Sequence, residues 1–307
     1  MKKVLSIVGP TAIGKTALSI KLAKQFPAEI ISGDSMQIYK GMDIGTGKIT
    51  QNEMQGIPHY MIDIKEPHES FSVAEFKELV EQYIAYIHER NKFPIIVGGT
   101  GLYIQSVLYD FEFTNRKRDE NLSKQLEQLV KEKGVEPLYE RLQKIDPEQA
   151  KKIHPNNYRR VIRAIEIYET TGLTMSEYHK RQKNEPKYDY LMIGLEMERT
   201  LLYKKINKRV DQMIEDGLIE EVKTLFEQGY EHTQAMKAIG YKELIPYFKG
   251  EQSLEQSIQL LKRNTRRYAK RQFTWFKNKM NVEWFNVTNN SETYEQIASR
   301  VEQFLSD

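Results

Sequence analysis

A glycine-rich stretch near the amino terminus constrains the fold more than any other feature of the chain. An apolar run, residues 4–8, precedes it, and residues 17–25 after it have helical spacing. The stretch between them matches G-x-x-x-x-G-K-[ST] and comprises Gly9, Pro10, Thr11, Ala12, Ile13, Gly14, Lys15 and Thr16. A strand, a loop of this pattern and a helix in succession predict a phosphate-binding loop in an α/β protein.

The residue types of this loop indicate its ligand. Gly9 and Gly14 allow successive backbone N–H groups to turn toward one point, and the following helix directs its positive end there. Lys15 adds a mobile positive charge, and the Thr16 hydroxyl is placed to hold a magnesium ion. The loop therefore predicts a site for a di- or triphosphate, with Mg²⁺ as cofactor.

Composition excludes several other classes of protein. The 307 residues contain no cysteine, 39% hydrophobic residues and 29% charged residues, as in ordinary globular proteins. No apolar run is long enough to span a membrane, and the chain starts in a strand rather than in a signal peptide. We therefore expect a cytoplasmic protein without disulfides. Because the net charge is only +3, binding of nucleic acid would require local clusters of basic residues.

Two further strands, predicted at residues 28–32 and 93–97, both end in polar or glycine-rich loops. In an open parallel sheet, ligands bind beyond the carboxyl ends of the strands, so Asp34 and Thr100 should lie near the phosphate-binding loop. A single Asp after a strand is also a common turn or cap residue. Phosphate-binding-loop ATPases commonly place an acidic residue at such a strand end to help hold magnesium. Two glycines stand there in this chain, which argues against ATP hydrolysis.

The segment 115–186 differs from the rest because it is highly charged, helical in pattern and without strand signals. Strand patterns resume at residues 190–196 and 282–287, which favours one sheet interrupted by an insertion. We therefore predict an α/β fold: a P-loop NTPase-like parallel sheet flanked by helices, with an inserted all-helical lobe. The catalytic core comprises residues 1–114 and 187–307, and the lobe comprises the segment between them.

Two predicted helices concentrate positive charge. The helix at residues 158–171 interleaves three arginines with apolar residues. In the helix at 253–280, no acidic residue occurs between Glu255 and Glu283, and basic residues recur at i, i+4 along one stripe: Lys262, Arg263, Arg266, Arg267, Lys270 and Arg271. Solvated basic faces normally interleave Glu, so a stripe without acids favours contact with a polyphosphate backbone.

With these residues identified, the chain resembles the tRNA dimethylallyltransferase (tRNA isopentenyltransferase) family along nearly its whole length. The motifs that carry the resemblance are GPTAIGKT at 9–16, ISGDSMQIYKGMDIGTGK at 31–48, VGGTGLYI at 97–104, IHPNNYRRVIRAIE at 153–166, AIGYKE at 238–243 and RRYAKRQFTWF at 266–276. Many kinases share the first motif, whereas the second and third are far more specific. The chain lacks the zinc-finger cysteines of many eukaryotic members, so it resembles the bacterial form.

The resemblance implies transfer of a dimethylallyl group from its diphosphate to the exocyclic amine of the adenosine 3′ of the anticodon, in tRNAs that read codons beginning with U. Asp34 is then the candidate base for the amine, and Thr100 supports the base or the leaving group. Lys15, and magnesium held through Thr16, stabilise the departing diphosphate. The loop residues 9–16 and Arg209 bind that diphosphate.

The resemblance also implies which residues contact tRNA. The target base must leave its stack to reach the allyl carbon, and the residues at 34–37 are placed to read it and its neighbours. The residues implied for tRNA binding are Asp34, Ser35, Met36, Gln37, Arg159, Arg160, Val161, Ile162, Arg163, Lys237, Gly240, Tyr241, Arg266, Arg267, Lys270 and Arg271. We expect a monomer that binds tRNA and dimethylallyl diphosphate.

Three alternatives stay open at this point. A small-molecule kinase would use the same loop, but it would not need a basic helical lobe. An adenylate isopentenyltransferase would perform the same chemistry on a free nucleotide, without an RNA-sized basic surface. A non-enzymatic RNA-binding module would leave the phosphate-binding loop and Asp34 without a role.

Overall fold

The computed structural model describes residues 1–307 except 112, 114–118, 182–184 and 289–291. The chain divides into two compact units, which are described separately: residues 1–109 with 186–307, and residues 110–185. The boundary predicted at 114/115 lies outside the described residues, and the one predicted at 186/187 differs by one residue from the observed boundary.

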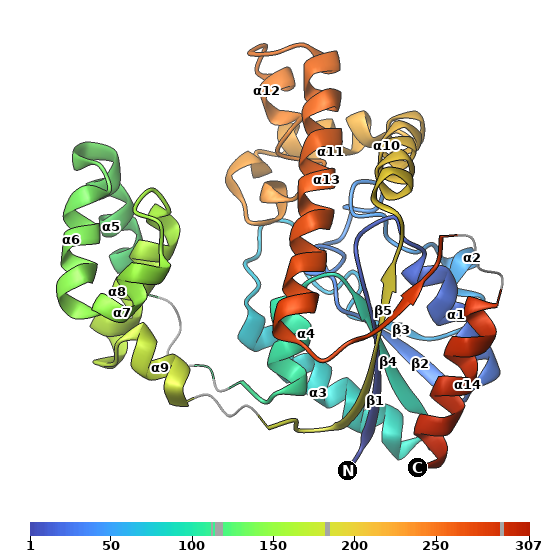
Figure 1. The fold of residues 1–307 in the computed structure, drawn as a ribbon. Helices are drawn as coiled ribbons and strands as arrows, with labels where there is room; N and C mark the ends of the chain where they lie inside the picture. The colour runs from blue at the N-terminus through green and yellow to red at the C-terminus, as the bar shows by residue number, and fades with distance from the viewer. Residues whose placement is uncertain (112, 114–118, 182–184, 289–291) are drawn as a thin grey trace. The chain divides into compact units, whose positions relative to one another are not determined.

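The first unit is built on a six-stranded sheet in the order β3-β2-β4-β1-β5-β6 (Figure 1). Every neighbouring pair of strands is parallel. The strands are β1 (Lys3–Val8), β2 (Ala28–Ser32), β3 (His59–Tyr60), β4 (Phe93–Gly98), β5 (Asp189–Glu196) and β6 (Glu283–Asn286). The predicted P-loop NTPase-like fold is thereby confirmed, and the sheet resumes after the insertion as predicted. The sequence did not reveal β3, because two residues that extend the edge of a sheet carry no periodicity.

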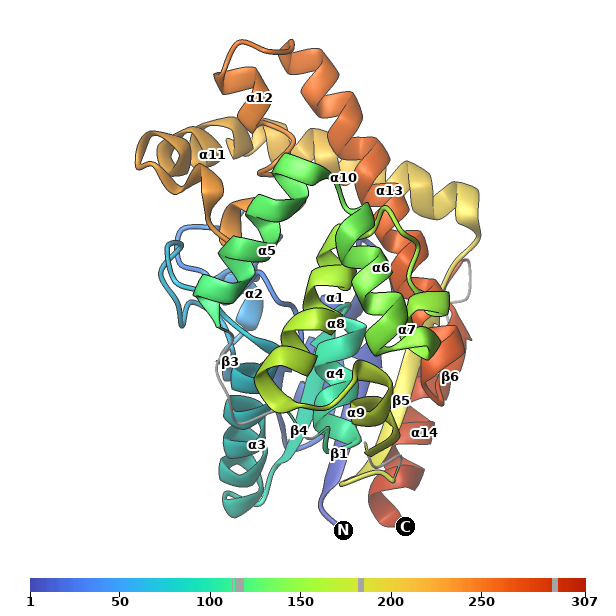
Figure 2. The same ribbon diagram turned by 90° about the vertical axis from the view of Figure 1, so that its left-hand side faces the viewer.

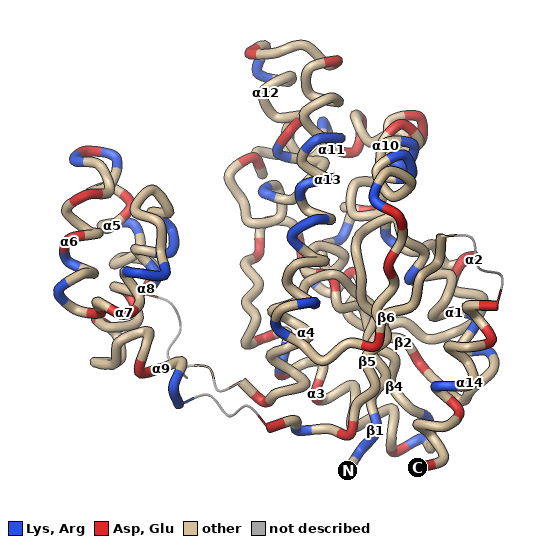
Figure 3. Tube along the Cα trace, in the orientation of Figure 1, with Lys and Arg blue, Asp and Glu red and all other residues tan. Residues whose placement is uncertain are grey.

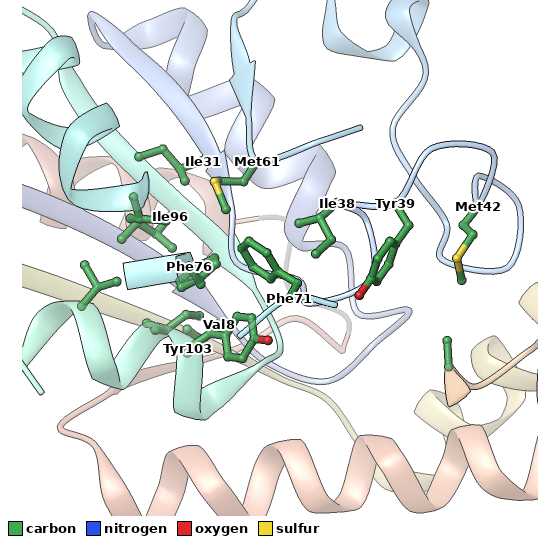
Figure 4. Close-up of a cluster of buried hydrophobic side chains, with 14 of the residues drawn as sticks. Val8, Ile31, Ile38, Tyr39, Met42, Met61, Phe71, Phe76, Ile96 and Tyr103 are labelled. Atoms are coloured by element: carbon green, nitrogen blue, oxygen red, sulfur yellow. The ribbon is translucent and has the colours of Figure 1, made fainter. Parts of the chain in front are cut away.

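Apolar side chains on the two faces of the sheet fill two separate cores. Within β1, Leu5 and Ile7 belong to one core, whereas Val4 and Val8 belong to the other, as the alternation of side chains along a strand requires. Helices α1 (Lys15–Gln25) and α14 (Thr293–Ser306) close the first core, and α3 (Val73–Glu89) and α4 (Gly101–Leu108) close the second. In the second core, the rings of Phe76 and Tyr103 lie 4.7 Å apart between centroids (Figure 4).

The other helices of this unit gather at the carboxyl end of the sheet. Helix α13 runs from Leu254 to Lys279, close to its predicted limits. It begins there because Ser253 and Gln256 form a capping box. It packs against α10 (Figure 2). The shorter elements are α2 (Gln51–Met54), α10 (Arg199–Glu215), α11 (Leu218–Glu227), η1 (Tyr230–His232), η2 (Ala235–Lys237) and α12 (Ile245–Phe248).

The described residues of the second unit form helices and the loops that connect them, as predicted. Its helices are α5 (Glu120–Lys133), α6 (Glu136–Ile145), α7 (Pro147–Lys152), α8 (Tyr158–Thr171) and α9 (Met175–Arg181). They enclose a small core of their own that includes Leu126, Leu142 and Ile165. Helix α8 begins after Asn157, whose side chain accepts a bond from the Arg160 N–H, and ends at Gly172 with φ +72°. In neither unit is a described helix both long and apolar enough to cross a membrane.

Candidate active site

The glycine-rich loop between β1 and α1 has the backbone that the motif predicts. Gly9 adopts φ +142°, and a Cβ added to it would lie 2.9 Å from the carbonyl oxygen of Leu195 on the neighbouring strand. Gly14 adopts φ +106° immediately before α1. Both positions therefore require glycine, because side chains disfavour such backbone angles and the space at Gly9 is already filled. The loop leads into the amino end of a helix of 11 residues, where anions bind favourably.

Lys15 folds back over this loop. Its Nζ donates to the carbonyl oxygens of Gly9 at 3.0 Å and Pro10 at 2.8 Å. Burial lowers the pKa of Lys15 to about 8, Asp34 raises it in part, and the positive charge of Arg209 lowers it further. The ammonium group is poorly solvated here, so an incoming diphosphate would supply the counter-charge that the site lacks.

A cavity of about 1150 Å³ opens beside the loop and is lined by residues of the first unit. The described lining residues include only two carboxylates, Asp34 and Glu53, against nine cations: Lys15, Lys21, Lys24, Lys205, Lys208, Arg209, Lys237, Lys242 and Arg271. An excess of this size concentrates anions in a cleft. The cavity therefore suits a ligand with several negative charges.

Asp34 follows β2 and lies at this cavity. Its Oδ1 accepts a hydrogen bond from the Met36 N–H at 2.8 Å, so the side chain does form the turn that was the alternative interpretation. Burial raises the pKa of Asp34, and the Met36 N–H and the Lys15 charge oppose that rise. A half-buried carboxylate with a raised pKa can accept a proton, so its turn role and a catalytic role are compatible.

Thr100 follows β4 and supports the loop that carries Asp34. Its Oγ1 accepts a bond from the Ser35 N–H at 3.2 Å, and its own N–H donates to the Gly33 carbonyl at 3.4 Å. A Cβ on Gly98 would overlap the carbonyl group of Gly33. The neighbouring strand ends thus approach so closely that no acidic side chain fits at Gly98, which gives a steric reason for the missing magnesium ligand.

Arg209 comes from α10 and reaches the same cavity. Its guanidinium packs on Gly47, where any Cβ would overlap it. Burial lowers the pKa of Arg209, whereas the charges of Asp34 and Glu53 raise it. The structure therefore brings together the loop, Lys15, Asp34 and Arg209, which are far apart in the sequence.

The remaining residues predicted to read the base surround this group. Ser35, Met36 and Gln37 line the cavity, as do Lys237 and Gly240. Gln37 is held in place, because its Oε1 accepts from the Ser32 hydroxyl at 2.8 Å and its Nε2 donates to the Gly47 carbonyl at 3.3 Å.

Three predicted RNA contacts are wrong for the side chains concerned. Tyr241 is 0% exposed, and its hydroxyl donates to Glu221 at 2.5 Å. Glu221 also accepts backbone N–H bonds from residues 43–45, so Tyr241 supports that loop from behind. Val161 and Ile162 are 0% and 1% exposed in the core of the second unit. Apolar and buried side chains of this kind hold the helices that carry the arginines.

Basic residues recur along α13 (Figure 3). Arg267, Lys270 and Arg271 are exposed, and Arg271 also borders the cavity. Arg266 differs, because its Nη1 donates to Asn207 at 2.6 Å. In the second unit, the exposed arginines of α8 are Arg159, Arg160 and Arg163, the last of them paired with Glu166 at 3.4 Å.

Two residues of α13 at the site were missed by sequence reasoning. Gln272 is buried between the phosphate-binding loop and the loop after β4, with its Oε1 3.0 Å from the Thr11 nitrogen. Tyr268 contacts Thr100 and Gln272 through its hydroxyl, and burial raises its pKa. Within a basic helix, a glutamine looks like a spacer. The sequence did carry one signal of its burial: Gln272 shares the buried face of the helix with Leu261, Ala269 and Phe276.

Fold and site together define the class: an α/β enzyme that binds a phosphorylated substrate at a glycine-rich loop and presents a carboxylate beside it. Comparison with known proteins makes the class specific. Residues 37–279 match the family model described as IPP transferase. The tRNA dimethylallyltransferase of Bacillus cytotoxicus is 60% identical over 96% of this chain and 93% of its own length. That of Oceanobacillus iheyensis is 56% identical over 92% and 91%. The chain belongs to the IPP transferase family.

Solved structures agree with this assignment. The full-length tRNA isopentenylpyrophosphate transferase of Bacillus halodurans is 50% identical, with a TM-score of 0.77, and the match covers 100% of this chain and 97% of that one. A eukaryotic dimethylallyltransferase crystallised while acting on tRNA is 33% identical, with a TM-score of 0.87 over 100% of this chain and 80% of the other. The predicted family resemblance is confirmed.

Proposed function

We propose that the protein transfers a dimethylallyl group from dimethylallyl diphosphate to the exocyclic amine of the adenosine 3′ of the anticodon, in tRNAs that read codons beginning with U, and releases diphosphate. The observation that carries this proposal is that a phosphate-binding loop and the carboxylate of Asp34 share one cation-lined cavity. The loop suits a diphosphate leaving group, and the carboxylate suits an amine nucleophile. Relatives that match over nearly the whole chain are tRNA dimethylallyltransferases.

The chemistry needs a base because an adenine amine is a poor nucleophile, its lone pair being delocalised into the ring. Asp34 accepts the amine proton while the nitrogen–carbon bond forms. The bond between the allylic carbon and the bridging oxygen breaks, and its electron pair leaves with the diphosphate. Backbone N–H groups of the loop, Lys15 and Arg209 stabilise that growing charge.

Thr100 acts on the base rather than on the leaving group. Its hydroxyl holds the Ser35 N–H, and Ser35 adjoins Asp34, so Thr100 fixes the turn that aims the carboxylate. The contact of Tyr268 with the Thr100 hydroxyl extends this support to α13. We propose that bound substrates exclude water from an allyl group with cation character.

We also propose Mg²⁺ as cofactor. Thr16 is exposed at the start of α1 and lines the cavity, where its hydroxyl can serve as one ligand. Among the described residues, no cluster of three or more His, Cys, Asp or Glu side chains could hold a metal. Mg²⁺ often takes one or two protein ligands together with substrate phosphates and water, so this donor set fits it. When bound, the ion neutralises charge on the departing diphosphate.

The RNA partner is proposed to contact the exposed cations of both units. Arg267, Lys270 and Arg271 on α13, with the arginines of α8, would bind the phosphate backbone, while residues 34–37 meet the splayed bases. We also propose that the enzyme is cytoplasmic and acts as a monomer.

One assay tests the proposal. Dimethylallyl diphosphate with a labelled allyl group is incubated with the protein, Mg²⁺ and either tRNA, AMP or ATP, and the labelled product is identified. Label in tRNA only is the expected result. Label in AMP or ATP would indicate a free-nucleotide enzyme, and tRNA-stimulated ATP hydrolysis without transfer would indicate a kinase or ATPase. The similarity of the chain to tRNA enzymes does not support either alternative.

A further inference from the structure

Gln272 connects two active-site loops that follow different strands. Its Oε1 accepts a hydrogen bond from the Thr11 N–H in the phosphate-binding loop at 3.0 Å. Its Nε2 donates to the carbonyl oxygen of Gly99, in the loop after β4, at 3.1 Å. The side chain is 5% exposed. One buried amide thus uses its acceptor on one loop and its donor on the other.

The surroundings leave little freedom to this amide. A Cβ on Gly99 would overlap the Nε2 of Gln272, so the helix approaches the loop as closely as a glycine allows. One turn earlier on α13, the Tyr268 hydroxyl contacts both Thr100 and Gln272. A buried amide that loses either partner leaves an unpaired polar group behind, so both bonds are strongly preferred.

The connected loops carry the two halves of the proposed reaction. The loop with Thr11 binds the leaving group, and the loop with Gly99 continues into Thr100, which supports the turn of Asp34. The exposed side of the same helix presents Arg267, Lys270 and Arg271. The helix that displays these cations outward therefore also fixes, on its inner side, the spacing between diphosphate and base.

On the basis of the proposed function, we infer that Gln272 is a positioning residue for prenyl transfer. It acts through Thr11 and Gly99, and it sets the distance between the bound diphosphate and the Asp34–Thr100 pair. Losing it should lower the rate of the chemical step far more than the affinity for either substrate. A displacement of about 1 Å between reacting groups can cost on the order of 10²-fold in rate.

Three variants of α13 test this role. Gln272→Leu keeps the approximate size and removes both bonds. Gln272→Glu keeps the acceptor for Thr11 but offers a donor to Gly99 only when it is protonated. Gln259→Leu is the matched control, because Gln259 lies on the same helix, is exposed, and bonds only to Glu255 among the described residues. For each variant one measures the melting temperature, single-turnover transfer at saturating substrates, and binding of tRNA and of a thiolo analogue of dimethylallyl diphosphate.

The expected pattern separates positioning from general stability. Gln272→Leu should lose about 10- to 100-fold in single-turnover rate while analogue and tRNA affinities change less than about threefold. Gln259→Leu should match the wild type. The rate of Gln272→Glu relative to wild type should rise as pH falls, because the protonated carboxyl restores the donor to Gly99. That pH readout does not require the leucine variant to fold.

Two results would overturn the inference. One is a folded Gln272→Leu variant that transfers at the wild-type rate. The other is a single-turnover rate of Gln272→Glu that stays in a constant ratio to the wild-type rate across pH. A wild-type protein that transfers no label would instead refute the proposed function, so the two failures are distinguishable.

Discussion

The loop after β1 and the loop after β4 lie at the same edge of one sheet and are both rich in glycine, but their glycines have different roles. In the first, Gly9 and Gly14 shape the backbone around an anion, and Lys15 supplies charge. In the second, Gly98 makes room for the neighbouring strand end, and Thr100 supports the turn of Asp34. Glycine therefore has two structural roles at this edge: it shapes an anion site in one loop and permits close packing in the other.

Removal of the base should produce the largest effect. Asp34→Asn keeps the shape and the bond from the Met36 N–H but cannot take a proton. We expect a loss on the order of 10²–10⁴-fold in single-turnover transfer, with tRNA affinity largely retained. A rate within a few-fold of wild type would leave Asp34 with its turn role alone. The loop after β4 would then support a turn but not a catalytic base.

The charge in the first loop should come next. Lys15→Ala removes the cation that faces the leaving group, and we expect a cost of at least ~2 kcal/mol in transition-state stabilisation. Single-turnover kinetics with dimethylallyl diphosphate measure it. If Lys15→Ala and wild type react at similar rates, the first loop acts through its backbone alone.

Adding one methyl group to the second loop should be costly for another reason. Gly98→Ala places a Cβ against the Gly33 carbonyl, and overpacking of this kind destabilises by about 1–3 kcal/mol. Chemical denaturation measures the loss in the free energy of unfolding. Gly41→Ala measures a different cost for comparison, that of a side chain on a left-handed backbone, since Gly41 has φ +70° and a Cβ there meets nothing within 4 Å. Equal stability of Gly98→Ala and wild type would contradict the packing role.

The pKa of Lys15 predicts how ligand binding depends on pH. Burial lowers that pKa to about 8, so the ammonium loses its proton above this pH in the free protein. Affinity for the thiolo analogue should therefore weaken by several-fold from pH 7.5 to pH 9.5, as titration calorimetry can measure. Lys15→Arg keeps its charge and should flatten the profile. A flat profile in the wild type would mean that Lys15 does not contribute charge to binding.

The smallest effect concerns neither loop. Replacing Arg267 and Lys270 with Ala should reduce the slope of log affinity for tRNA against log salt by roughly one unit per lost phosphate contact, without changing analogue affinity. Arg271 is left intact, because it borders the cavity. An unaltered slope would place RNA binding elsewhere. Arg266 is left intact, because its bond to Asn207 gives it a structural role.

Much of the molecule could be predicted because its signals are local. The phosphate-binding loop, five of the six strands and helices α8 and α13 carry periodicity, caps or a motif within a short window. Strand β3 was not predicted because it is two residues long. Helix α14 was not predicted either, although its buried residues Ile297, Val301 and Phe304 have helical spacing. Tyr241 was misassigned because a motif match does not show which side of a loop a side chain faces.

The sequence by itself determined that a phosphate-binding loop opens an α/β sheet, that Asp34 follows the second strand, and that one long helix is basic. These are properties of short stretches, where neighbouring residues dictate backbone geometry. Only the tertiary structure decided that Arg209 reaches that loop, that Gly98 leaves no room for an acid, and that Gln272 ties two loops together. Each of these depends on atoms brought within a few ångströms by packing, and such distances are set by the whole fold rather than by any one segment.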